Sequence, residues 1–277
     1  MSRIWFVTGA SRGFGLEICR AALAAGDSVV ATARRPDEIA LPDDERVMRV
    51  ALDVTDADTA DAAVEAAQER FGRVDVCVNN AGYGLVGAVE EVDDDEARAL
   101  FDVNVFGLLN VTRAVLPGMR EAGSGRIINL SSVAGIASGP GSGIYSASKY
   151  AVEGISEAQR QELEPLGIFV TVVEPGVFRT DFLDPSSLRT AAATIDDYAA
   201  TDRRGWAESE NHRQTGDPAK AAAAILELAR SPEPPLRLPL GADCVERIEA
   251  KLARFRSELD TWWSVSTSTG RDEGEAR

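Results

Sequence analysis

Two scarce residue types stand four positions apart in the stretch IYSASKYAVEG, residues 144–154. The chain of 277 residues holds 4 Tyr and three Lys, so chance is a poor explanation for Tyr145 and Lys149 at this spacing. On a helix, positions i and i+4 share one face, which would set a phenol beside an ammonium. A phenol with a pKa of about 10 can exchange a proton with a reacting oxygen, but near neutral pH it needs its phenolate stabilised. We therefore expect the charge of Lys149 to lower the pKa of Tyr145.

A glycine-rich stretch, TGASRGFG at residues 8–15, lies between an apolar run and a helix-like segment. Gly9, Gly13 and Gly15 would let the backbone turn tightly and approach a ligand, and the helix start would direct free N–H groups at a pyrophosphate. The spacing is GxxxGxG rather than the GxGxxG of the common dinucleotide fingerprint. The alternative is a turn without a ligand. The position between strand and helix favours a dinucleotide site.

The end of the second apolar run indicates which dinucleotide. NAD-selective sites place an acid there to hold the ribose 2′-hydroxyl, whereas a 2′-phosphate requires Arg. Here Arg34 and Arg35 follow Ala33, no acid comes before Asp37, and Arg12 lies within the glycine-rich stretch. Guanidinium groups bind phosphate with two parallel hydrogen bonds. The sequence favours NADP(H) over NAD(H), the alternative being that these arginines are solvated turn residues.

The elements that must position these residues alternate between strands and helices. Apolar, mostly β-branched runs are typical of strands buried on both faces of a parallel sheet, and they occur at Ile4–Val7, Ser28–Thr32, Val47–Leu52, Val74–Val78, Arg126–Leu130 and Phe169–Val173. Helical periodicity occurs between them, at Gly15–Ala25, Asp56–Phe71, Asp93–Glu121 and Tyr145–Leu166. This alternation predicts an α/β fold of the Rossmann type, with a doubly wound parallel sheet.

The pattern changes after residue 180. Residues 181–215 are polar with scattered aromatic residues, and we expect an irregular or loosely helical excursion that forms a substrate lid. A helix capped by Asp217 should follow, then a Pro-rich connector with a short strand, then an amphipathic helix at Cys244–Trp263. We expect one domain: residues 1–180 as the core, 181–215 as the lid, 216–263 as C-terminal helices and 264–277 as a flexible tail.

Composition narrows the class of protein. The net charge is −16 and the sequence pI is about 4.6, which disfavours binding to nucleic acid or to an anionic membrane. Cys19, Cys77 and Cys244 form no CxxC pair and fit reduced thiols, and the single His212 excludes His-rich metal sites. No signal peptide or run of 18 apolar residues is visible. We expect a soluble, cytoplasmic protein without a metal.

Taken in order, these motifs resemble the short-chain dehydrogenase/reductase family over roughly residues 3–180. The resemblance is carried by TGxxxGxG (8–15), LDV (52–54), NNAG (79–82), Asn104 in FDVNVFG, NLSSVAG (129–135), YxxxK (145–149) and PGVFRT (175–180). Ser132 precedes Tyr145 by the family's interval of 13 residues. The C-terminal part is similar to 17-beta-hydroxysteroid dehydrogenase-like and retinol dehydrogenase-like members.

The resemblance implies roles for individual residues. It implies a catalytic set of Asn104, Ser132, Tyr145 and Lys149, in which Ser132 donates a hydrogen bond to the reacting oxygen and Asn104 fixes a water that links Lys149 to solvent. It implies that the cofactor is bound by Gly9, Ser11, Arg12, Gly13, Phe14, Gly15, Arg34, Asp53, Val54, Asn80, Ala81, Gly82, Tyr145, Lys149, Pro175, Gly176, Val177 and Thr180. In this set Asp53 and Val54 border the adenine, and the backbone near Val177, with the Thr180 hydroxyl, holds the nicotinamide carboxamide.

The function expected from all this is an NADP(H)-dependent carbonyl reductase, which interconverts a ketone or aldehyde and its alcohol. Tyr83, Leu85, the segment 134–144 and lid residues such as Phe182, Leu183 and Trp206 should form an apolar substrate pocket. Two rivals stay open: an NAD-dependent alcohol dehydrogenase and a non-catalytic cofactor-sensing regulator. The resemblance further implies a homodimer or homotetramer paired through the long helices Asp93–Glu121 and Tyr145–Leu166.

Overall fold

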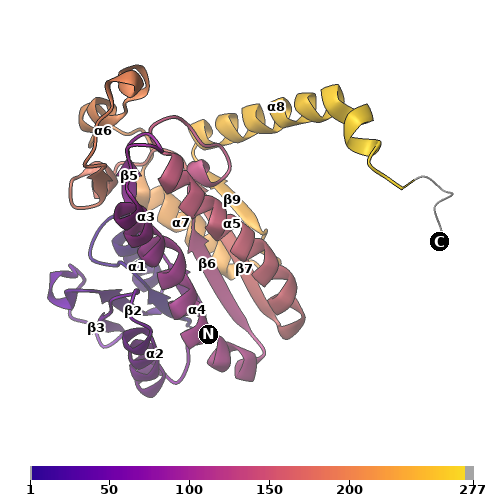
Figure 1. Ribbon diagram of the computed structural model, residues 1–277. Coiled ribbons are helices and arrows are strands. Elements are labelled where there is room, and N and C mark those ends of the chain that lie inside the picture. Colours follow the sequence, from indigo (N-terminus) through magenta and orange to yellow (C-terminus); the bar gives the residue numbers. More distant parts are fainter. Residues whose placement is uncertain (1, 272–277) are drawn as a thin grey trace.

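A seven-stranded parallel sheet forms the centre of the molecule in the computed structural model, which describes residues 2–271 (Figure 1). Its strands are β1 (Ile4–Val7), β2 (Ser28–Ala33), β3 (Val47–Ala51), β4 (Val76–Asn79), β6 (Gly125–Leu130), β7 (Ile168–Pro175) and β9 (Arg237–Leu240). They lie in the order β3-β2-β1-β4-β6-β7-β9, so the chain reverses its direction of travel across the sheet between β1 and β4. A crevice forms at the carboxyl ends of the strands beside such a switch point. The predicted fold class is confirmed.

Helices cover both faces of the sheet. The bounds are α1 (Gly13–Ala24), α2 (Ala57–Phe71), α3 (Asp94–Phe101), α4 (Gly107–Ala122), α5 (Gly143–Leu163), α6 (Arg204–Glu210), α7 (Pro218–Arg230) and α8 (Ala242–Thr267). Buried apolar residues of α1 and α7 pack on one face, and those of α2, α4 and α5 pack on the other. Trp5 and Phe6 on β1 point to opposite faces and are both fully buried, as the alternation of a central strand requires.

Local sequence signals account for several helix starts. Asp56 accepts hydrogen bonds from the Asp58 and Thr59 N–H groups, and Asp217 accepts from Ala219 and Lys220. Asp93 and Glu96 form a reciprocal capping box at the start of α3. These carboxylates satisfy N–H groups that no helical turn can satisfy. Each of these three helices therefore begins directly after its capping residue.

The predicted helix at Asp93–Glu121 is confirmed as one helical stretch, Asp94–Ala122, but its middle is not α-helical. Residues Asp102–Phe106 form a wider π-turn between α3 and α4, with Asn104 buried inside it. A π-turn inserts one residue per turn and is often retained where a side chain has a function. At Gly107, just beyond the turn, an added Cβ would overlap Val54, so glycine allows α4 to approach the loop after β3. The interruption sets the direction in which Asn104 points.

The excursion at residues 181–215 contains a strand that its composition did not predict. β8 (Leu188–Thr190) pairs in parallel with β5 (Gly84–Val86), outside the main sheet. The rest is irregular or helical as expected, with short 3₁₀ turns at Asp181–Leu183 and Asp196–Thr201 followed by α6. We call residues 181–215 the lid.

Buried Glu91 attaches the lid to the core. Its carboxylate accepts from the N–H groups of Ala88 and Ile195 at 2.8 and 2.9 Å, and it pairs with Arg204 at 3.2 Å. These bonds hold the pKa of Glu91 below its ordinary value, the Ile195 N–H having the largest effect. The lid therefore lies over the carboxyl ends of the strands in a defined position.

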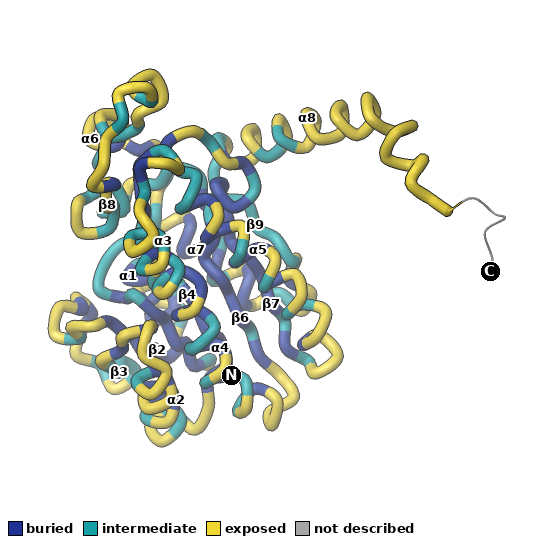
Figure 2. The backbone as a smooth tube through the Cα atoms, in the orientation of Figure 1, coloured by how far each residue is buried: buried dark blue, intermediate teal, exposed yellow. Residues whose placement is uncertain are grey.

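Helix α8 projects away from the rest of the protein (Figure 1). It was predicted at Cys244–Trp263 and extends from Ala242 to Thr267. Figures 1 and 2 show it projecting outward, with most of its length exposed. Among its residues only Cys244 is buried. Residues 264–267 of the expected flexible tail are helical, and residues 272–277 lie outside the described residues.

Two further expectations concern thiols and membranes. All three cysteines are fully buried and unpaired, so Cys19, Cys77 and Cys244 form no disulfide. In the described part of the chain, one helical stretch, Asp94–Ala122, is long and apolar enough to cross a membrane, although no run of 18 apolar residues was seen in the sequence. That stretch packs on the sheet and on α2 and α5, as a core helix does.

Candidate active site

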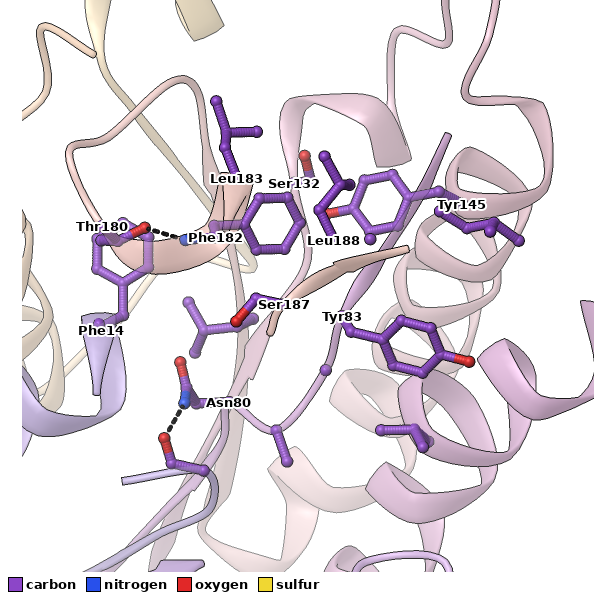
Figure 3. A pocket seen from close by; sticks show the side chains of 18 of the residues that line it. Phe14, Asn80, Tyr83, Ser132, Tyr145, Thr180, Phe182, Leu183, Ser187 and Leu188 are labelled. Atoms are coloured by element: carbon purple, nitrogen blue, oxygen red, sulfur yellow. Dashed lines mark hydrogen bonds between the residues drawn. The ribbon is translucent and has the colours of Figure 1, made fainter. Parts of the chain in front are cut away.

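A deep cavity of about 640 Å³ opens at the carboxyl ends of the central strands and beneath the lid. Its walls come from the glycine-rich loop, the ends of β2, β3, β4, β6 and β7, the start of α5 and the lid. Figure 3 shows Ser132 and Tyr145 at one side of this space and Phe14, Asn80 and Thr180 at the other. With two exceptions, Gly15 and Asn104, every residue predicted to bind the cofactor or act in catalysis lines this cavity.

Backbone geometry explains the three glycines of the loop. Gly9 and Gly13 have φ of 64° and 54°, a region that side chains disfavour. A Cβ on Gly15 would collide with the Gly9 carbonyl and would lie 2.6 Å from Asn80 Nδ2. Gly15 thus lies behind the loop, where it allows α1 to begin close to β4, and this explains why it does not line the cavity.

The loop is fixed in place by Thr8 and Asn80. The Thr8 hydroxyl accepts from the N–H groups of Asn80 and Ala81, both at 2.9 Å. In return the Asn80 amide donates to the carbonyls of Thr8 and Gly9 at 2.8 and 3.1 Å. These bonds join the ends of β1 and β4, on either side of the switch point. Rigid backbone on both sides is suitable for holding a ligand across the crevice.

The cavity fits a dinucleotide. No side chain caps the N-terminus of α1, so the first N–H groups of the helix are free to bind an anion beside Ser11, Gly13 and Phe14. At Gly9 and Gly15 an added Cβ would press against Asn80 and the neighbouring backbone, so glycine allows the compact turn that precedes the helix. The loop would hold the pyrophosphate, and the pocket beyond it has room for both ends of the cofactor.

The end of the cavity expected to hold the adenine is bounded by Asp53, Val54 and Arg34. Asp53 accepts from the Thr55 hydroxyl at 2.7 Å and from its N–H at 3.0 Å, and these bonds, together with the nearby charge of Arg34, lower the pKa of Asp53. Arg35 does not join them: it faces solvent and pairs with Glu38 at 3.0 Å. Arg12 lines the cavity, but its guanidinium donates to the Ser186 carbonyl of the lid at 2.8 Å. Of the three arginines that favour NADP(H) in the sequence, Arg34 therefore lies at this end of the cavity, and Arg12 is shared with the lid.

Tyr145 and Lys149 lie on the first turns of α5, buried on one face. The Lys149 ammonium lies 5.9 Å from the centre of the Tyr145 ring and donates to the Leu130 carbonyl at 2.8 Å. Ser132 follows β6 and lies near the Tyr145 phenol, and its hydroxyl acts to lower the pKa of the phenol. The phenol and the Ser132 hydroxyl therefore lie near each other in the cavity (Figure 3), and Lys149 lines the same cavity.

The direction of the Tyr145 pKa shift is opposite to the expected one. Burial raises the pKa of Tyr145 to about 12 and outweighs the opposing effect of Ser132. Burial also lowers the pKa of Lys149 to about 8, against the opposing charge of Glu153. Desolvation disfavours the charged phenolate and is the largest cause of this shift. At neutral pH the phenol keeps its proton, which is the form that can protonate a substrate oxygen.

Asn104 does not line the cavity, but its side chain hydrogen bonds to residues that position the cavity wall. Its side-chain amide donates to the Tyr83 carbonyl and accepts from the Tyr83 N–H, both at 3.0 Å, and it donates to the Ser148 hydroxyl at 3.2 Å. Ser148 in turn donates to the Tyr145 carbonyl at 2.7 Å. Asn104 thereby connects the loop after Gly82 to the helix that carries Tyr145 and Lys149.

The segment after β7 contains one arrangement that the sequence did not predict. Pro175, Gly176, Val177 and Thr180 line the cavity, but the Val177 N–H donates to the carboxylate of Asp243 on α8 at 3.0 Å. The Val177 carbonyl accepts from the Gly216 N–H at 3.1 Å, and the Thr180 hydroxyl accepts from the Phe182 N–H at 3.3 Å. The groups expected to hold a carboxamide therefore already have partners within the chain.

Several polar residues near the site were missed because they contact one another only in the folded chain. Glu153, one turn beyond Lys149, shares Arg237 with Glu174, which is fully buried. Burial, followed by the charge of Glu153, raises the pKa of Glu174 to about 8. Asn79 donates to Asn129 at 2.8 Å, and Asn129 donates to Ser156, which joins β4 and β6 to α5. The motif NNAG was a signal for Asn79, whereas no local pattern marked Glu174.

Comparison with known sequences agrees with this geometry. The short chain dehydrogenase family matches residues 3–190. Oxidoreductase BOA17 of Botryotinia fuckeliana (strain B05.10) is 41% identical over 272 residues, 95% of this chain and 97% of that protein. The 3-ketodihydrosphingosine reductase of Bacteroides thetaiotaomicron is 38% identical over 240 residues, 86% of this chain and 88% of that protein.

Solved structures give the same result. A short-chain dehydrogenase from Streptomyces avermitilis shares 44% identity, with a TM-score of 0.90 over 98% of this chain and 100% of that one. Enzymes from Burkholderia cenocepacia in complex with NADP (27% identity, TM-score 0.74, 94% and 96% covered) and Burkholderia phymatum in complex with NAD (26%, 0.77, 95% and 95%) are also similar. The chain therefore belongs to the short-chain dehydrogenase/reductase family and is an oxidoreductase that acts on CH–OH groups with NAD(P).

Proposed function

We propose that this protein is an NADPH-dependent carbonyl reductase, which converts a ketone or aldehyde with an apolar body to its alcohol. The observation that carries the proposal is the meeting of Ser132, Tyr145 and Lys149 in one cavity with the glycine-rich loop. A bound nicotinamide supplies the hydride for such a reduction. The residues of the chain orient the substrate and provide the proton.

The chemistry of the site favours reduction. Ser132 and Tyr145 can both hydrogen bond to a carbonyl oxygen, where negative charge develops as the carbon is reduced. Because burial keeps the phenol protonated, Tyr145 can give its proton to that oxygen. The Lys149 ammonium would then stabilise the phenolate that is left behind. Its hydrogen bond to the Leu130 carbonyl holds it in position.

The preference for the phosphorylated cofactor rests on the end of β2. Arg34 lines the cavity beside Asp53, and no acid stands between Ala33 and Arg35 to hold a ribose 2′-hydroxyl. Solved relatives are found with NADP and with NAD, so the choice depends on these side chains. The NAD-dependent alcohol dehydrogenase stays the rival within this family.

The apolar part of the pocket lies around Tyr145. Its ring packs with Leu85, Leu100 and Ala134 and lies 5.9 Å from the Phe182 ring of the lid. Leu183, Leu188 and Trp206 line the same space. A substrate with an apolar body would fill it. We also propose that the protein is cytoplasmic and forms a homo-oligomer.

Purified protein incubated with NADPH and a panel of aliphatic, aromatic and cyclic ketones and aldehydes tests the proposal. We expect NADPH to be consumed with apolar carbonyl compounds, with formation of the matching alcohol. A protein that binds NADPH but consumes none with any member of the panel would instead be the non-catalytic regulator. Turnover confined to small, charged carbonyl compounds would contradict the apolar substrate.

A further inference from the structure

Two arginines from distant parts of the chain face the substrate half of the cavity. Arg203 belongs to the lid and packs on the loop at Gly141, just before α5, while Arg247 extends from the second turn of α8. Both line the same cavity as Ser132 and Tyr145. Neither residue was marked by any sequence motif.

Each guanidinium is held in position without an acid. Arg203 stacks over the Trp206 ring at 4.2 Å, and Arg247 donates to the Ala137 carbonyl at 2.8 Å. No carboxylate in the described residues lies within ion-pair distance of either. Both side chains line one cavity, and burial followed by the charge of Arg247 lowers the pKa of Arg203. In a chain of net charge −16, two cations that line one cavity without an acid form a place for an anion.

Gln214 adds a neutral polar group to the same cavity. It is 3% exposed, and neither its amide nitrogen nor its amide oxygen has a partner among the described residues. A buried amide without a partner is costly, and a polar ligand would satisfy it. The cavity thus combines an apolar wall around Tyr145 with cationic and amide groups elsewhere in its lining.

We propose, building on the reductase function above, that the substrate carries a carboxylate apart from its carbonyl group and that Arg203 and Arg247 bind this carboxylate. The apolar body of the substrate then lies against Leu85, Phe182 and Trp206, with the carbonyl at Tyr145. The substrate class is an oxo acid of amphiphilic shape. A carboxylate bridging two guanidinium groups would also remove their mutual repulsion.

The test compares medium- and long-chain oxo acids with their methyl esters, since the two differ only in the charged group. We expect kcat/KM for the acids to exceed that for the esters by at least tenfold. Arg203→Met and Arg247→Met should each reduce this ratio toward one, mainly through KM, and Arg203→Lys should retain part of it. Arg213→Met, on an exposed lid arginine outside the cavity, should leave the ratio unchanged.

The two proposals fail in different ways. Equal kcat/KM for acids and esters in the wild type would overturn the carboxylate site while the reductase function stands. An unchanged acid preference in Arg203→Met and Arg247→Met would do the same. Absence of NADPH consumption with acids, esters and the neutral panel would overturn the reductase function itself.

A separate observation concerns the outer face of α8. Apolar residues recur along it at alternating intervals of three and four, at Val245, Ile248, Leu252, Phe255, Leu259 and Trp262. This is the a/d pattern of a coiled coil, and it extends for about 26 Å at 1.5 Å per residue. Leu252, Phe255 and Trp262 are more than half exposed, at 57%, 52% and 62%. We call these six residues the α8 seam.

The charges beside the seam indicate its partner. Lys251 and Glu258 occupy positions that flank it on one side, and neither makes an ion pair within the described residues. When two copies of α8 lie antiparallel with Leu252 against Phe255, Lys251 of each chain opposes Glu258 of the other. Glu249 and Arg256, on the other side, oppose each other in the same register. A parallel pair would instead bring Lys251 against Arg256, with like charges facing.

We propose that the α8 seam binds the α8 seam of a second copy of this chain in an antiparallel pair. Self-complementary charge selects a second copy as the occupant and selects the antiparallel direction. The exposed helix in Figure 2 then becomes an interface. The catalytic bodies would lie at opposite ends of the paired helices.

Sedimentation velocity of the full chain tests this arrangement. We expect Leu252→Lys/Leu259→Lys to halve the association state or raise the dissociation constant more than tenfold, while Ser257→Lys, on the side of α8 away from the seam, changes neither. Lys251→Glu should weaken the antiparallel pair, and Lys251→Glu/Glu258→Lys should restore it. In a parallel pair Lys251→Glu would strengthen association, which would overturn the direction. A monomeric wild type, or an assembly unaffected by the seam variant, would overturn the interface.

Discussion

The Asn104 amide binds the backbone of Tyr83 on both sides, donating to its carbonyl and accepting from its N–H, each at 3.0 Å. This pair of bonds imitates one rung of a β-ladder, made by a side chain. The π-turn at Asp102–Phe106 directs Asn104 into this position. The same amide reaches the Ser148 hydroxyl, so one residue positions both the loop after Gly82 and the helix of Tyr145.

Asn104→Ala should therefore reduce both stability and turnover. Two backbone groups of Tyr83 lose their partner, which costs about 1–3 kcal/mol of unfolding free energy. Urea denaturation and steady-state kinetics measure the two effects. Asn104→Asp keeps an acceptor for the Tyr83 N–H but loses the donor, and it should fall between Asn104→Ala and wild type. Equal turnover in all three proteins would contradict the positioning role.

Tyr145→Phe should remove reduction without unfolding the protein. The general acid is lost, and kcat/KM should fall by about 10²–10⁴. The ring itself keeps its packing against Phe182 and Leu85, so the melting temperature should change little. Binding of NADPH, followed by cofactor fluorescence, should be retained. Wild-type kcat/KM in Tyr145→Phe would mean that another group supplies the proton.

Arg34→Ala should change the choice of cofactor. If Arg34 binds the 2′-phosphate, the ratio of kcat/KM for NADPH to that for NADH should fall by about tenfold to a hundredfold, the range expected for one charge-assisted bond. Arg35→Ala provides a matched control, because Arg35 faces solvent and pairs with Glu38. A ratio unaffected by Arg34→Ala, or a wild type that favours NADH, would support the NAD-dependent rival.

Gly15→Ala should prevent cofactor binding. The added methyl group would overlap the Gly9 carbonyl and the Asn80 amide, which together set the shape of the loop. Isothermal titration with NADPH should detect no binding, or binding weakened at least a hundredfold. Gly154→Ala is the control: a Cβ there meets nothing within 4 Å, and alanine in the middle of α5 should add about 0.5–1 kcal/mol of stability. Normal cofactor affinity in Gly15→Ala would refute this account of the loop.

Glu174→Gln should change how stability depends on pH. The pKa of Glu174 is raised in the folded protein to about 8 from 4.5, so its contribution to stability is full below pH 4.5 and is lost as the pH rises to about 8. Unfolding free energy of the wild type should therefore fall between pH 5 and pH 8 relative to Glu174→Gln, by a few kcal/mol at most. Urea titrations at these two values measure it, with exposed Glu162→Gln as the control. An equal effect of Glu174→Gln at both values would exclude this titration.

Local sequence patterns were sufficient to predict much of the fold and of the candidate site. Each strand of the main sheet is a short apolar run, and Gly9, Gly13, Tyr145 and Lys149 are set by spacing within single elements. The boundaries were off by a few residues where a strand continues into a polar end, as at Asn79 and Pro175. These features could be predicted because their causes lie within a few residues of one another.

The rest depends on contacts between distant segments. The π-turn at Asn104 contains no proline or glycine to mark it, and β8 forms only because β5 lies opposite. Arg203 and Arg247 are 44 residues apart in the sequence and line one cavity only in the folded chain. The raised pKa of Tyr145 likewise follows from burial, which the spacing of Tyr145 and Lys149 does not reveal.

The burial of all three cysteines has a practical consequence. Burial is the largest cause that raises the pKa of each thiol, so each stays protonated and out of reach of alkylating reagents while the protein is folded. A cysteine introduced at the exposed position Ser257 would then be the accessible, reactive thiol while the protein is folded. A single fluorophore or spin label attached there could report the separation between two α8 helices without removal of any native cysteine.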